Sequence, residues 1–228
     1  MLNPSNHTLY LFDIDGTLLS PGSVSRMTLD RIIRDVTGKS PVLDYKDVAG
    51  YTDPAIVKKA LIKIGFHDSN LKVLIDQILT IYIQRLDTAF NQSNEPFVYE
   101  DGKRFLELVI AQGHAIGLMT GNMQATARIK LHRFGLEEYF PFGVFGDDVN
   151  SRMEMPAVAI KRAFDYYSHA YYFEDMVIVG DTANDAKAAF LCGAQSVIVC
   201  RKLQYRDAII QAGATIVVSS LNELIPHT

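Results

Sequence analysis

Six short apolar runs along the chain have the length of buried strands, and helical patterns separate the later ones. The runs cover residues 8–12, 115–119, 144–145, 176–179, 196–199 and 215–218. Apolar residues recur at helical spacing in the segments 102–112, 122–134, 156–167 and 184–191. Strands that alternate with helices imply right-handed crossovers and a mostly parallel sheet. The pattern therefore predicts an α/β fold with a Rossmann-like core, in which helices cover both faces of the sheet.

Residues 20–96 interrupt this alternation. They contain no convincing strand pattern, and their apolar residues recur at helical spacing in three successive segments. The stretches 20–23 and 91–96, at the two ends of the region, have the composition of linkers. We therefore expect an all-helical domain at 20–96, inserted into an α/β core domain formed by residues 1–19 and 97–228.

Composition narrows the class of protein. Hydrophobic residues make up 48% and charged residues 21% of the 228 positions, as in ordinary globular proteins. The net charge of −4 predicts no general attraction to nucleic acid or to an anionic membrane. No apolar run approaches the length of a membrane span, and residues 1–7 are polar and contain no Lys or Arg. Two cysteines fit neither a zinc site nor a disulfide framework. We expect a cytoplasmic monomer or small homo-oligomer.

Three sets of polar residues each follow a predicted strand. They are Asp13, Asp15 and Gly16, then Thr120, Gly121 and Asn122, and finally Asp181 and Asp185. Ligands of an open parallel sheet bind beyond the carboxyl ends of its strands, so the three sets can converge on one pocket. Paired carboxylates repel unless a cation lies between them, and a hydroxyl with amides at a helix start can cradle phosphate. Taken singly, the sets also fit an acidic turn or a helix cap.

In this order, the three sets resemble the motifs of the haloacid dehalogenase superfamily. The first family motif reads Asp-x-Asp-Gly-Thr and is intact at 13–17. The second is a Ser or Thr after a later strand, matched by Thr120, and the fourth, Gly-Asp-x-x-x-Asp, is matched at 180–185. The position of the insert resembles the C1 helical cap of the phosphoglycolate phosphatase-like and β-phosphoglucomutase-like branch. That resemblance implies a cap that closes over the site.

The third motif departs from the family pattern. Members of the superfamily usually carry a lysine, often followed by proline, some way before the fourth motif. The corresponding stretch here contains Arg152, and Lys161 further along the chain is its rival. Arginine can bind phosphate and carboxylate in bidentate fashion, which suits charge neutralisation. We therefore expect Arg152 in the site and Lys161 on the surface of a helix.

The resemblance implies a role for each residue. Asp13 would be the nucleophile that forms an aspartyl-phosphate, and Asp15 the general acid and then the general base. Mg²⁺ would be held by Asp13, by the backbone carbonyl of Asp15 and by Asp181, with Asp185 supporting the ligands. The residues expected to bind phosphate oxygens are Thr120, Gly121, Asn122 and Arg152.

The loop Gly50-Tyr51-Thr52 resembles a cap loop that reads substrate in related enzymes. It fits equally well as a linker that caps the following helix, and both interpretations stay open.

The expected function is that of a Mg²⁺-dependent phosphatase acting on a small phosphate ester, phosphoglycolate-like or a sugar phosphate. The second aspartate of the first motif, Asp15, disfavours dehalogenation, because dehalogenases of this superfamily need no acid/base there. A phosphomutase of the same fold is the main alternative. A non-catalytic protein that binds a phosphorylated ligand is a further one, although the intact acidic motifs argue against it. The substrate itself is not specified by the sequence.

Overall fold

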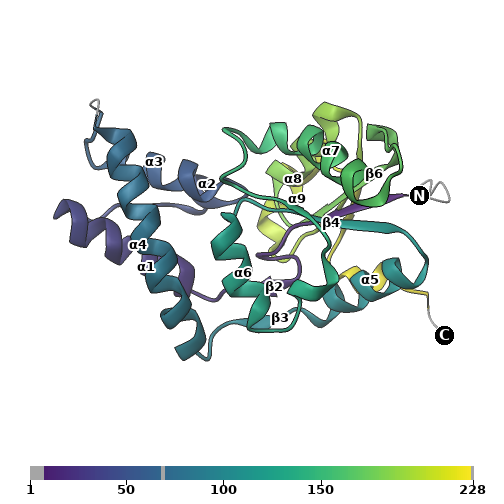
Figure 1. The fold of residues 1–228 in the computed structure, drawn as a ribbon, viewed down its shortest axis with the longest axis horizontal. Helices are drawn as coiled ribbons and strands as arrows, with labels where there is room; N and C mark the ends of the chain where they lie inside the picture. The colour runs from purple at the N-terminus through teal and green to yellow at the C-terminus, as the bar shows by residue number, and fades with distance from the viewer. Residues whose placement is uncertain (1–7, 68–69, 227–228) are drawn as a thin grey trace.

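The computed structural model describes residues 8–67 and 70–226, and a six-stranded parallel sheet forms the centre of its core (Figure 1). Its six strands lie in the order β5-β4-β1-β6-β7-β8. They are β1 (Leu9–Phe12), β4 (Ala115–Met119), β5 (Gly143–Val144), β6 (Met176–Gly180), β7 (Gln195–Val199) and β8 (Ile216–Val218). In register, Phe12 of β1 lies between Leu118 of β4 and Val179 of β6. The residues that follow these three strands therefore meet at one edge of the sheet.

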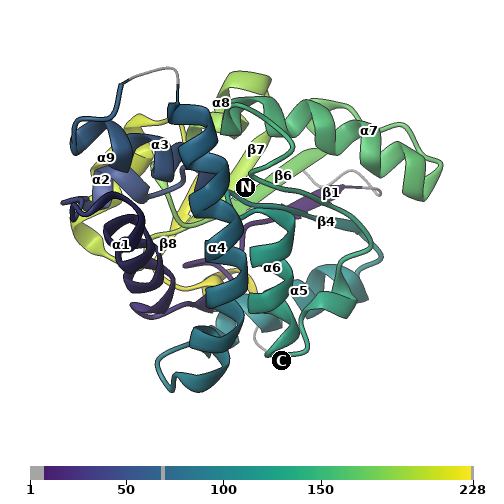
Figure 2. The same ribbon diagram turned by 60° about the vertical axis from the view of Figure 1, so that its left-hand side comes forward.

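Helices cover both faces of the sheet (Figure 2). They are α5 (Glu100–Ala111), α6 (Gln124–His132), α7 (Met155–Tyr167), α8 (Ala183–Cys192) and the short α9 (Arg206–Gln211). Successive side chains of a strand point to opposite faces. Tyr10 and Phe12 accordingly pack with residues of α5 and α6, whereas Leu9 and Leu11 pack with residues of α7 and α8. The predicted α/β fold with helices on both faces is confirmed.

Residues 24–92 form the helical insert, which lies to one side of the sheet in Figure 1. Its helices are α1 (Val24–Thr37), α2 (Tyr45–Val48), α3 (Asp53–Lys63) and α4 (Leu71–Gln92). Buried residues such as Ile33 of α1 and Leu86 of α4 belong to one apolar cluster, which continues into the core. Within the described residues, no helix is both long and apolar enough to cross a membrane.

A short antiparallel pair joins the two ends of the insert. Its strands are β2 (Leu19–Ser20) and β3 (Phe97–Val98). The expectation that residues 20–96 hold no strand is therefore wrong at Ser20. A strand of two residues is too short to show an alternating pattern in the sequence. These two strands are recognisable only because they pair with each other across the insert. The division of the chain into two domains stays a prediction.

Candidate active site

Three carboxylates meet where β1 and β6 end. One oxygen of each of Asp13, Asp181 and Asp185 lies within 4.8 Å of those of the other two. Gly16 permits the close approach of the two chain segments. It has a left-handed φ of +83°, and a Cβ built on it would lie 2.1 Å from Asp181 Oδ2. The first and fourth motifs therefore come together as expected from the strand order.

The environment of Asp13 and of Asp181 disfavours the negative charge of these two carboxylates. Burial raises the pKa of Asp13 to about 6, although Arg152 lowers it, and Asp185 and Asp15 raise it further. Burial, followed by the charges of Asp185 and Asp13, also raises the pKa of Asp181 well above its ordinary value. Asp181 Oδ1 is buried and has no hydrogen-bond partner among the described residues. Clustered carboxylates with an unpartnered oxygen fit a divalent cation of the Mg²⁺ type, which prefers oxygen ligands.

Arg152 reaches the acidic cluster from a short 3-10 helix, Arg152–Glu154, which leads directly into α7. Its side chain is buried, and Nη2 lies 3.4 Å from Asp13 Oδ1 and also contacts Asp185 Oδ1. The same Nη2 donates to the Met119 carbonyl at 3.4 Å. Lys161, by contrast, is exposed on α7. Arg152 is therefore the cation of this pair that lies in the site, while its role in binding phosphate stays a proposal.

Asp185 links the start of α8 to Arg152. Its Oδ2 accepts hydrogen bonds from the Thr182 N–H at 3.0 Å and from the Thr182 hydroxyl at 2.6 Å. The Asp185 N–H donates to Thr182 Oγ1 in return at 3.4 Å, which completes a capping box. The other oxygen, Oδ1, contacts Arg152. Asp185 also lies close enough to share a cation with Asp13 and Asp181, while its role in supporting the metal ligands stays a prediction.

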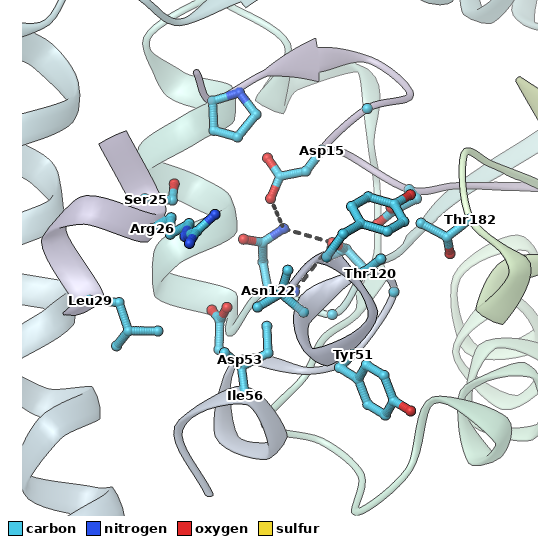
Figure 3. Close-up of a pocket in the computed structure, with 18 of the residues that line it drawn as sticks. Asp15, Ser25, Arg26, Leu29, Tyr51, Asp53, Ile56, Thr120, Asn122 and Thr182 are labelled. Atoms are coloured by element: carbon cyan, nitrogen blue, oxygen red, sulfur yellow. Dashed lines mark hydrogen bonds between the residues drawn. The ribbon is translucent and has the colours of Figure 1, made fainter. Parts of the chain in front are cut away.

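The second motif joins the site after β4. The Asn122 side-chain amide donates to Asp15 Oδ2 at 3.1 Å and to the Thr120 hydroxyl at 2.9 Å (Figure 3). A hydrogen bond from Thr120 to Asp13 lowers the pKa of that carboxyl. The motif therefore connects Asp13 with Asp15. Its hydroxyl and amide lie beside the acidic cluster, where phosphate oxygens are expected.

The loop Gly50-Tyr51-Thr52 lies against the second motif. A Cβ built on Gly121 would lie 2.3 Å from the Tyr51 carbonyl oxygen, so the contact requires glycine there. The Thr52 side chain also accepts a hydrogen bond from the Ala55 N–H at 3.3 Å and caps α3. The loop is a helix cap and at the same time part of the cavity wall, so the two interpretations of its sequence are compatible.

Sequence reasoning missed two buried charged residues. The Lys130 ammonium on α6 lies 2.5 Å from Asp15 Oδ2. Asp53, at the start of α3, accepts hydrogen bonds from the Met123 N–H at 3.0 Å and from the Thr126 hydroxyl at 2.8 Å. A signal for Lys130 was present, because it shares one face of a predicted helix with apolar residues. No local pattern distinguished Asp53 from an ordinary first-turn acid.

A cavity of about 390 Å³ lies between the core and the insert. Its core side is formed by residues of the three motifs together with Lys130, Arg152 and Lys202. Its insert side combines apolar residues such as Leu29 and Ile56 with the charged residues Arg26, Asp30 and Asp53. In Figure 3, Leu29 lies on the same helix as Ser25 and Arg26, whereas Ile56 lies beside Asp53. A volume of this order accommodates a small organic ligand.

Comparison with known proteins assigns the chain to a family. The sequence model of the family described as "Haloacid dehalogenase-like hydrolase" matches residues 10–199 of this chain. The chain belongs to the haloacid dehalogenase-like hydrolases. The match includes Asp13, Thr120 and Asp181, and it confirms the superfamily resemblance drawn from the motifs.

Individual relatives are distant but cover nearly the whole chain. A phosphoglycolate phosphatase of Salmonella choleraesuis is 24% identical, over 94% of this chain and 90% of the relative. The solved structure of CbbY from Rhodobacter sphaeroides in complex with phosphate has a TM-score of 0.75 at 18% identity and covers 96% of both chains. A candidate β-phosphoglucomutase from Thermotoga maritima has a TM-score of 0.65 at 22% identity, over 95% of this chain and 98% of that one. The two solved structures establish the shared fold.

Proposed function

We propose that this hydrolase is a cytoplasmic, Mg²⁺-dependent phosphatase that cleaves a small phosphorylated metabolite through an aspartyl-phosphate intermediate. The observation that carries the proposal is the pairing of two aspartates in one cavity. Asp13 is buried beside Arg152, where it can act as a nucleophile. Asp15 lines the same cavity, and its Oδ1 has no hydrogen-bond partner among the described residues. A nucleophile next to an acid/base is the minimum that two-step hydrolysis requires.

The chain is a phosphoric monoester hydrolase, a class supported by its family and by its phosphoglycolate phosphatase relatives. The relatives make phosphoglycolate the first substrate to test. The cavity of about 390 Å³ suits an ester of that size or a sugar phosphate better than a polymer.

The first step transfers the phosphoryl group to the protein. An oxygen of Asp13 attacks phosphorus, and the bond between phosphorus and the ester oxygen breaks. Asp15 in its protonated form gives its proton to the departing oxygen, so that an alcohol leaves. The Arg152 guanidinium, the Thr120 hydroxyl and the Gly121 N–H bind the phosphoryl oxygens, where negative charge redistributes.

The second step regenerates Asp13. Asp15, now a carboxylate, takes a proton from water, whose oxygen attacks phosphorus and displaces the Asp13 oxygen as inorganic phosphate forms. Residues of the insert line one side of the cavity, and closure of the insert over it would limit the access of other water. Mg²⁺ would be held by Asp13, by the Asp15 backbone carbonyl and by Asp181, with Asp185 beside them. When bound, it neutralises charge on the carboxylates and the phosphoryl oxygens.

Hydrolysis of a panel of phosphate esters in the presence of Mg²⁺ tests the proposal. The panel contains phosphoglycolate, sugar phosphates and 4-nitrophenyl phosphate, and released phosphate is measured. Asp13→Asn should lower kcat by about a thousandfold or more, because the amide is a poor nucleophile. The matched control is Asp165→Asn, an exposed position on α7. Substantial turnover by Asp13→Asn, with native circular dichroism, would contradict the assignment of the nucleophile.

Product analysis separates the alternatives. A phosphatase releases inorganic phosphate in step with the alcohol. A phosphomutase, the function named for one structural neighbour, returns the phosphoryl group to a second position of the sugar and releases little phosphate. Saturable binding of phosphate esters without any turnover would instead indicate a non-catalytic binding protein.

A further inference from the structure

Lys130 enters the catalytic cavity from α6 and is almost completely buried. Only 1% of the residue is exposed. Its ammonium nitrogen lies 2.5 Å from Asp15 Oδ2 and 2.5 Å from Asn122 Oδ1. Burying an ammonium group is costly unless it is paired and hydrogen-bonded, so these two contacts define where the side chain lies. The motifs that identified the family do not include this lysine.

The contacts of Lys130 hold one oxygen of Asp15 and leave the other available. Oδ2 receives the Lys130 ammonium and, at 3.1 Å, the Asn122 side-chain amide. Oδ1 is buried and has no hydrogen-bond partner within the described part of the chain. An acid/base is effective only when its reactive oxygen lies within hydrogen-bond reach of the group that gains or loses the proton. Anchoring Oδ2 determines where Oδ1 points.

Lys130 also determines how the Asn122 amide is turned. Its ammonium occupies the oxygen side of the amide. The nitrogen side therefore donates to Asp15 Oδ2 at 3.1 Å and to the Thr120 hydroxyl at 2.9 Å, as Figure 3 shows. If the amide were reversed, its NH₂ group would face the Lys130 ammonium, and two donors would meet. Lys130 therefore orients both Asp15 and its second hydrogen-bond donor.

We propose that Lys130 is a positioning residue, which clamps the Asp15 carboxylate through Oδ2 so that Oδ1 meets the leaving oxygen of the substrate. This rests on the proposed function, in which Asp15 protonates the leaving group. Lys130 acts through Asp15 and Asn122. Its removal should therefore impair proton donation to the leaving group far more than the attack by Asp13.

The test compares two generic esters of similar size, phenyl phosphate and 4-nitrophenyl phosphate. Phenolate is the poorer leaving group and depends more on a proton donor, whereas 4-nitrophenolate leaves with little help. The measured quantity is kcat/KM, which excludes steps after the release of the leaving group. Lys130→Met should lower kcat/KM for phenyl phosphate by at least about tenfold more than for 4-nitrophenyl phosphate. Unfolded enzyme lowers both values equally, so their ratio is independent of the folded fraction.

Two further variants make the result decisive. Lys161→Met, an exposed control on α7, should keep the wild-type ratio. Asp15→Asn should show the same leaving-group dependence as Lys130→Met. If it shows none, the acid role in the proposed function fails, and the Lys130 proposal fails with it. If Asp15→Asn shows the dependence but Lys130→Met lowers both substrates equally, the positioning proposal alone is overturned.

A more conservative substitution covers the case in which Lys130→Met does not fold. Lys130→Gln keeps one donor for Asp15 and should give a ratio between those of the wild type and Asp15→Asn. A wild-type ratio in a folded Lys130→Gln, together with an altered ratio in Asp15→Asn, would likewise overturn the proposal.

Discussion

The carboxylate of Asp53, in the insert, accepts a hydrogen bond from the Met123 N–H of the core at 3.0 Å. Met123 precedes the first turn of α6, where backbone N–H groups lack partners within the helix. The same carboxylate oxygen receives the Thr126 hydroxyl at 2.8 Å. A residue of α3 thereby caps a helix of the core, and this contact holds the insert over the cavity.

Loss of that cap should release the insert. Asp53→Ala should expand the enzyme in small-angle scattering and speed proteolysis in the connecting segments 21–23 and 93–96. It should also raise KM severalfold, because closure becomes less favourable. Asp35→Ala is the control, since Asp35 pairs with Arg85 on the exposed surface of the insert. An unchanged scattering profile and unchanged linker cleavage in Asp53→Ala would contradict a mobile insert.

Arg152 should matter far more than Lys161. Arg152→Ala removes the buried cation 3.4 Å from Asp13 and should lower kcat/KM by about a hundredfold or more. Arg152→Lys should retain part of the activity, because it keeps the charge but loses the bidentate geometry. Lys161→Ala alters an exposed position and should leave kinetics unchanged. Equal losses of kcat/KM in Arg152→Ala and Lys161→Ala would show that Arg152 is not the cation on which catalysis depends.

Mg²⁺ should stabilise the protein as well as support turnover. A cation between Asp13, Asp181 and Asp185 relieves their mutual repulsion and binds only the folded chain. At pH 7, millimolar Mg²⁺ should raise Tm by several degrees over chelator-treated protein, and Asp181→Asn should abolish most of that shift. Activity should disappear after chelation and return with Mg²⁺. Full activity and an unchanged Tm in the chelated enzyme would exclude a divalent metal requirement.

The raised pKa of Asp13 predicts how stability depends on pH in metal-free protein. Burial raises this pKa from 3.8 to about 6, so the folded state holds a proton that the unfolded state has lost in this window. Stability contributed by the protonated form is therefore lost as pH rises from about 4 to about 6. Against Asp13→Asn, which lacks the titrating group, wild-type Tm should fall across that window on the order of 5 °C. A constant Tm difference between the two proteins would contradict the raised pKa.

The sequence by itself determined the architecture and the order of the chemical groups. Strand and helix periods are local properties, so 115–119 was readable as a strand without knowledge of its neighbours. Because carboxyl ends of parallel strands share one edge, the positions of Asp13, Thr120 and Asp181 after three such strands predicted that they would meet. The family motifs are local in the same way.

Tertiary structure alone decided which charges became buried partners. Lys130 and Asp15 lie 115 positions apart, and Asp53 meets Thr126 across 73 positions. No short-range pattern encodes such pairs, since a lysine or aspartate on a helix is equally compatible with solvent until packing removes the water around it. The same reason explains why the pattern could propose Arg152 over Lys161 but only the packing could place it. Local periodicity specifies the elements, whereas long-range burial selects the partners of each charge.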